Sequence, residues 1–175
     1  MIFKLDTKIL PSSTFKLSAV SLAISASILQ VDATQAATIR VNSNLDSTGT
    51  NNNVCILRDA IESVNETTLQ GGCVIEPGTG SLGIDGQDDE IVFDSSLSGG
   101  TIMLDGAQLI TLEPVIINAS ALDQRLTIDG GNQTRIFELR DSTQLNNLIL
   151  TNGDGGTQGG GAIRLSVLNL SLIHI

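Results

Sequence analysis

Ile84-Asp85-Gly86, Leu104-Asp105-Gly106, Ile128-Asp129-Gly130 and Thr151-Asn152-Gly153 are four short turns, each closing a run of β-prone apolar residues. Their Asp or Asn residues stand at positions 85, 105, 129 and 152, so the turns recur at a nearly even spacing in the low twenties. Such a repeat is about the length of one coil of a β-solenoid. The sequence therefore predicts an all-β chain of stacked parallel strands.

Short strands follow one another from residue 88 onward, each bounded by turn residues. Residues 85–165 have room for about three and a half coils of ~23 residues. A β-sandwich of similar strand length is the alternative, and the recurring period favours the solenoid. The expected strands are Ile91–Phe93, Thr101–Leu104, Leu109–Leu112, Val115–Asn118, Leu126–Asp129, Arg135–Leu139, Leu145–Leu150 and Gly161–Leu165.

Residues 1–36 have the layout of a secretory signal peptide. Lys4, Lys8 and Lys16 precede a short apolar run over 17–29, and Thr34-Gln35-Ala36 supplies small residues at a cleavage site after position 36 or 37. A membrane anchor is the alternative, but the run is short for a bilayer span. We therefore expect a secreted or cell-surface protein with a cap over 37–87 and coils over 88–175.

Loss of the signal peptide removes every lysine and leaves six arginines against seventeen acidic residues, a net charge of −11. Such a surface repels the phosphate backbone of nucleic acids and anionic lipids. Nucleic acid is therefore excluded as a partner, whereas divalent cations are compatible with this charge.

One amphipathic helix is expected before the strands, because Ile56, Leu57, Ala60, Ile61 and Val64 share one helical face. A solenoid needs a cap over its terminal core and strand edges, and this helix suits that role. Cys55 and Cys73 are expected to form a disulfide, which could add about 3 kcal/mol of stability. A reactive thiol or a metal site is the alternative for the two cysteines.

The segment Cys55-Ile-Leu-Arg-Asp-Ala-Ile61, followed by Asn65, resembles the CSLREAI motif of bacterial exported proteins. Leu57, Arg58, Ala60 and Ile61 match the motif and Asp59 replaces Glu, whereas Ile56 stands in place of Ser. Later segments that resemble the same family are Asp89–Asp94, Leu126–Gly131, Arg135–Glu138, Leu148–Gly153 and Gly159–Ile163. The resemblance covers about residues 38–165 and implies a right-handed, single-stranded parallel β-helix of the pectin-lyase-like type. It also implies an adhesin-like role and transfers no catalytic residues.

The residues themselves indicate no catalytic site and no cofactor. The sole histidine, His174, stands at the far end of the chain, so no histidine base is available in the core. The glycine-rich segment 153–161 lacks the Lys-Ser/Thr of a phosphate-binding loop and is expected to be a tight turn. Asp85, Asp88, Asp89 and Glu90 are a weak candidate for Ca²⁺ binding, with a solvated loop as the alternative.

The sequence thus favours a non-enzymatic structural or adhesive protein at the bacterial cell surface. Its expected partners are an extracellular surface, a polysaccharide or a host or matrix protein. The apolar segment 165–175 has no terminal cap, so we expect further coils and an outer-membrane anchor beyond it. A polysaccharide lyase or glycoside hydrolase, with its site late in or outside this chain, is the alternative function.

Overall fold

The computed structural model describes residues 35–47, 54–84 and 86–166. The expected signal peptide, apart from its last two residues, lies outside this range. So do Asp85 of the candidate Ca²⁺ site and residues 167–175 of the apolar segment.

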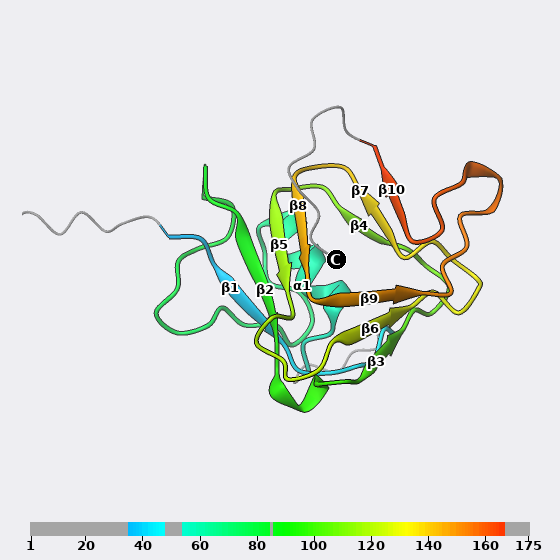
Figure 1. The fold of residues 1–175 in the computed structure, drawn as a ribbon. Helices are drawn as coiled ribbons and strands as arrows, with labels where there is room; N and C mark the ends of the chain where they lie inside the picture. Colours follow the sequence, from blue (N-terminus) through cyan, green and yellow to red (C-terminus); the bar gives the residue numbers. More distant parts are fainter. Residues whose placement is uncertain (1–34, 48–53, 85, 167–175) are drawn as a thin grey trace, which may run out of the picture. The chain divides into compact units, whose positions relative to one another are not determined.

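The described chain forms one α-helix and ten strands in three parallel sheets, with two short 3₁₀ turns (Figure 1). The first sheet has the order β1-β2-β5-β8, the second β3-β6-β9 and the third β10-β7-β4. The elements are β1 (Thr38–Val41), α1 (Leu57–Glu66), β2 (Asp89–Phe93), β3 (Thr101–Met103), β4 (Leu109–Thr111), β5 (Val115–Asn118), β6 (Leu126–Asp129), β7 (Phe137–Leu139), β8 (Thr143–Asn146), β9 (Leu148–Thr151) and β10 (Ile163–Leu165), with 3₁₀ turns at Ser95–Leu97 and Gly156–Gln158.

From β2 onward, strands that follow one another in the sequence lie in different sheets, whereas β1 pairs with β2 in the first sheet. The succession β2, β3, β4 visits the three sheets in turn, and β5–β7 and β8–β10 repeat the same order. Every ladder between these strands is parallel. The predicted fold of mostly parallel strands with one helix is therefore confirmed.

The register corrects the even repeat inferred from the turns. Val115 pairs with Thr143, whereas Leu126 pairs with Leu148, so the step from β5 to β8 is longer along the sequence than the step from β6 to β9. Asp129 pairs with Met103 and Thr151, so the Asp and Asn residues of the turns do not occupy equivalent positions. The steps differ because the connecting loops differ in length, and the turns alone could not set the register.

Aliphatic side chains of register partners stack behind one another in the core. In the first sheet Ile39 pairs with Ile91, Ile91 with Ile117 and Ile117 with Leu145, and all four are fully buried. The alternating burial of β2 and β5 follows from the two-residue period of a strand, which sends every second side chain inward. Parallel pairing then joins these inward positions into one continuous apolar core.

The prediction of a single strand over 145–150 is wrong, because the structure divides this segment between β8 and β9. Asn147 separates them with a φ of 58°, in the left-handed region that asparagine adopts more readily than most residues. The chain therefore turns a corner at the pair Asn146-Asn147, and Leu145 and Leu148 on either side are both fully buried.

The predicted helix and disulfide are both present. The apolar face of α1 buries Leu57, Ala60, Ile61 and Val64. Cys55, just before the helix, is bonded to Cys73, and both cysteines are buried. None of the helices within the described residues is long and apolar enough to cross a bilayer.

Candidate functional site: the contact between the helix and strand β4

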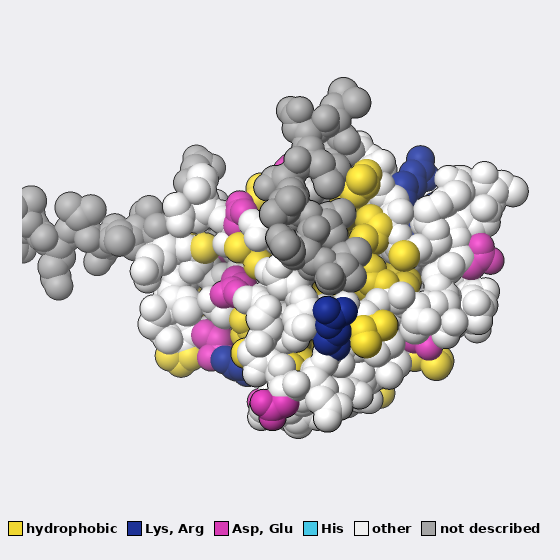
Figure 2. All heavy atoms as spheres, viewed as in Figure 1, with side chains coloured by type: hydrophobic (Ala, Val, Ile, Leu, Met, Phe, Trp, Pro, Cys, Tyr) yellow, Lys and Arg dark blue, Asp and Glu magenta, His cyan; other side chains and the backbone are white. Residues whose placement is uncertain are grey.

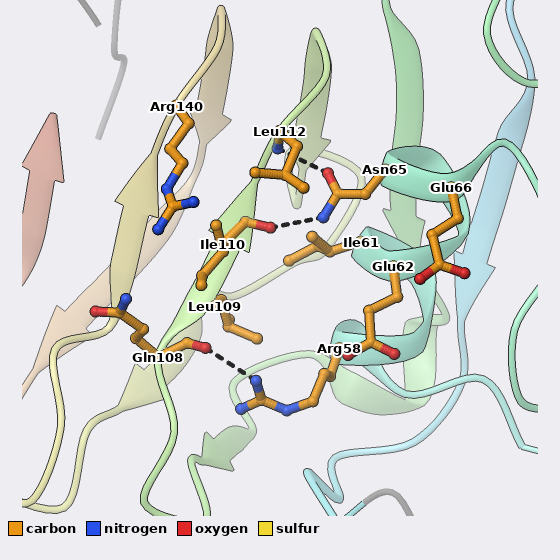
Figure 3. A pocket seen from close by; sticks show the side chains of 10 residues that line it. All are labelled: Arg58, Ile61, Glu62, Asn65, Glu66, Gln108, Leu109, Ile110, Leu112 and Arg140. Carbon is orange, nitrogen blue, oxygen red and sulfur yellow. Dashed lines mark hydrogen bonds between the residues drawn. The ribbon is translucent and has the colours of Figure 1, made fainter. Parts of the chain in front are cut away.

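Strand β4 is the last strand of its sheet, with β7 on one side and α1 nearby on the other. An edge strand presents a row of backbone N–H and C=O groups that need partners. Figure 3 shows that side chains of α1 reach this row across a small hollow. The helix therefore takes the position at β4 that a further strand would otherwise occupy.

Arg58 closes one end of the row. Its Nη1 donates to the Gln108 carbonyl oxygen at 2.9 Å, and its Nη2 donates to the Ala107 carbonyl oxygen at 2.8 Å. The same guanidinium contacts both carboxylate oxygens of Asp46, with Nε–Oδ1 and Nη2–Oδ2 distances of 3.1 and 2.8 Å. The Asp46 side chain is only 2% exposed and also accepts the backbone N–H of Asp105 at 2.8 Å. This bidentate pair fixes the loop before α1 against the loop before β4.

Asn65 binds the other end of the row of backbone groups on β4. Its Nδ2 donates to the Ile110 carbonyl oxygen at 2.8 Å, and its Oδ1 accepts the Leu112 N–H at 2.7 Å (Figure 3). A residue on a neighbouring parallel strand would make the same two hydrogen bonds through its peptide groups. The Asn65 side chain therefore substitutes for one residue of a missing strand.

The residues that resemble the CSLREAI motif thus have separate structural tasks. Cys55 forms the disulfide, Leu57, Ala60 and Ile61 fill the core, and Arg58 binds the β4 edge. Asp59 is half-buried, and this burial raises the pKa of its carboxyl more strongly than the Arg58 charge lowers it. The sequence singled out these positions but gave no signal for Asp46, because the polar loop that carries it has no periodic pattern.

Two of the acidic residues proposed for Ca²⁺, Asp89 and Glu90, point to opposite faces of β2. Asp89 is buried, and its carboxylate accepts the backbone N–H groups of Ala37 and Gly83 at 2.8 and 2.9 Å. Glu90 points to the other face of β2 and accepts the Asn118 amide at 2.8 Å. Among the described residues, which include Asp88 but not Asp85, no three His, Cys, Asp or Glu side chains group as metal ligands. Asp89 and Glu90 therefore act as acceptors within the fold.

A second polar network holds the glycine-rich segment. Arg135 is 6% exposed, and its Nε and Nη2 donate to the Gly160 and Gly159 carbonyl oxygens at 2.9 and 3.0 Å. Its Nη1 donates to Gln108 Oε1 at 2.7 Å. A Cβ on Gly153 would lie 2.2 Å from the Gly161 carbonyl oxygen, so the backbones meet in the predicted tight turn. The network therefore joins the loop before β4 to the glycine-rich loop before β10.

Between α1 and β4 lies a pocket of about 290 Å³. Its floor is apolar, with Ile61, Ile110 and Leu112 between the two elements (Figure 3). Glu62 and Glu66 project from α1 on one side, and Arg140 projects from beyond β7 on the other.

Partial burial raises the pKa of the Glu62 carboxyl, and the charge of Asp59 raises it further. The two glutamates stand on one side of the pocket instead of facing each other across it, as a glycosidase pair would. The pocket is therefore suited to binding a ligand through charge and apolar contact.

Comparison of the chain with models of known protein families, with curated proteins and with solved structures found no significant match.

Proposed function

We propose that this chain forms an exported right-handed parallel β-helix with a structural or adhesive role at the bacterial surface. The three-sheet succession β2–β4, β5–β7 and β8–β10 supports successive coils of one solenoid. Its parallel ladders stack each coil on the one before. The disulfide suits an oxidising compartment outside the cytoplasm.

The observation that carries this proposal is the way α1 seals the β4 edge. A solenoid built for display must prevent edge-to-edge pairing at its first coil, since an open parallel edge recruits other strands. Arg58 and Asn65 satisfy the backbone of that edge, and both belong to the segment that resembles the CSLREAI motif. The resemblance and the observed contacts thus support the same role for the helix.

The partners consistent with this role are an extracellular surface, a polysaccharide, or a host or matrix protein. On the face in Figure 2, acidic side chains lie at separate points among mostly uncharged atoms. Such a surface favours contact with polar or cationic groups and disfavours nucleic acid. Attachment to the outer membrane through a further region of the protein completes the proposal.

Export is tested by expressing residues 1–175 in a Gram-negative host and measuring the mass of the recovered protein. We expect cleavage after Ala36 or Ala37, recovery outside the cytoplasm and an intact Cys55–Cys73 bond. A charge in the apolar run, Leu22→Arg, should keep the chain in the cytoplasm with its full length and reduced cysteines, whereas Leu22→Ile should be processed normally.

Recovery of the unprocessed chain from the cytoplasm would contradict the proposal of export.

The non-enzymatic role is tested separately with acidic polysaccharides, with and without Ca²⁺. Release of unsaturated products that absorb in the ultraviolet would favour the lyase alternative instead.

A further inference from the structure

The pocket between α1 and β4 holds a carboxylate, that of Glu62, without a hydrogen-bond or ion-pair partner among the described residues. Glu62 lines the pocket and is half-buried, and no hydrogen bond or ion pair joins its carboxylate to another described residue. Glu66, one helical turn further along, accepts only the Gln70 amide, at 2.8 Å. Two negative side chains thus stand together on one wall of the pocket.

Arg58 is close to Glu62 in the sequence, but its donors are bound to other groups. Its donors contact both oxygens of Asp46 and the carbonyl oxygens of Ala107 and Gln108. Arg140, on the opposite wall, is paired with Glu138 at 2.9 Å. Neither arginine forms an ion pair with Glu62, and the Arg58 charge lowers the pKa of Glu62 less than burial and the Asp59 charge raise it. A ligand that brings a cation to Glu62 would therefore gain from this charge.

The remaining surface of the pocket favours an organic cation with an apolar stem. Ile61, Ile110 and Leu112 form the floor, and Leu112 is 44% exposed. A volume of about 290 Å³ has room for one long side chain. A bare metal ion does not fit this pocket. The described residues do not supply three acidic ligands there, and an apolar floor offers a metal ion no ligands. Lysine combines four methylene groups with a terminal ammonium and matches both features.

We propose that this pocket binds a lysine side chain of a partner polypeptide, with its methylene stem on Ile110 and Leu112 and its ammonium at Glu62 and Glu66. This inference rests on the adhesive role proposed above and names the chemistry of the partner. The chain itself is a poor source of the ligand, because its only lysines are Lys4, Lys8 and Lys16 within the expected signal peptide. The excess of acidic residues, 19 against 9 basic, further favours a basic partner.

The test uses the full chain and a short peptide, acetyl-Gly-Ala-Lys-Ala-Gly-amide, with binding followed by NMR chemical shifts. We expect shifts confined to α1, β4 and Leu112. Glu62→Gln should weaken binding at least tenfold, because it removes a charge-assisted contact. The matched control Glu113→Gln, which neutralises an exposed acid outside the pocket, should change the affinity less than twofold.

A peptide with norleucine in place of lysine keeps most of the stem without the ammonium and should bind at least tenfold more weakly. Equal affinity for the two peptides, equal losses in Glu62→Gln and Glu113→Gln, or shifts mainly outside α1, β4 and Leu112 would each overturn the proposal. So would tighter binding of free 1,5-diaminopentane than of the peptide, which would indicate a site for small amines. All of these results are independent of export, so they leave the proposed cellular role to its own test.

Discussion

Arg58→Ala should lower the free energy of unfolding by about 3–5 kcal/mol, because it breaks a buried ion pair and opens the β4 edge. The Asp46 carboxylate, 2% exposed, would lose its counter-charge without gaining access to water. The carbonyl groups of Ala107 and Gln108 would lose their donors at the same time. Urea unfolding followed by far-ultraviolet circular dichroism measures the loss as a lower transition midpoint.

Arg125→Ala is the matched control, since it removes the same charge from an exposed side chain. Its effect should stay within about 0.5 kcal/mol. Arg58→Lys should fall between the two, because an ammonium keeps the charge but cannot make the bidentate contact. A loss below about 1 kcal/mol in Arg58→Ala, the size of a typical surface effect, would show that the helix does not depend on this contact to seal the edge.

Leu148→Asp should cost about 4 kcal/mol or more, enough to unfold much of the protein at room temperature. Leu148 is fully buried in β9 and pairs with Leu126, which is also fully buried. An aspartate there would place an unpaired carboxylate within the apolar core. Thermal unfolding monitored by circular dichroism should show a large fall in Tm or no cooperative transition.

The neighbouring substitution Ile149→Asp provides the control for this prediction. Ile149 is 42% exposed because alternate residues of β9 point to opposite faces. It should therefore change stability by less than about 1 kcal/mol. Equal tolerance of both substitutions would place Leu148 at the surface and contradict the observed orientation of β9.

The parts of the fold that were predicted correctly are those with a local pattern. Val115–Asn118 and Leu126–Asp129 coincide with β5 and β6, since each is a short apolar run bounded by turn residues. The face of α1 followed from its apolar spacing, and the Cys55–Cys73 bond followed from cysteine count and expected export.

The parts that could not be predicted depend on contacts between distant segments. The corner at Asn147 falls on the pair Asn146-Asn147, a turn signal between apolar residues that the expectation of one continuous strand passed over. The Arg58–Asp46 pair joins the helix to the loop before it, and Asn65 reaches backbone groups of β4, which is distant in the sequence. Such contacts depend on the register of the strands. The spacing of the turns predicted that register incorrectly.

The stacking of successive coils in register is tested most directly by cross-linking Ile116→Cys with Gln144→Cys. These residues pair across β5 and β8, so their Cα atoms should lie about 5 Å apart, within disulfide range. The control pair Ile116→Cys with Asn146→Cys is displaced along the strand and should lie about 8 Å apart, too far for a bond without backbone movement. We predict rapid oxidation of the first pair, shown by peptide mass mapping, with the native Cys55–Cys73 bond intact. Preferential bonding of the displaced pair, or no bond in either, would contradict the parallel stack.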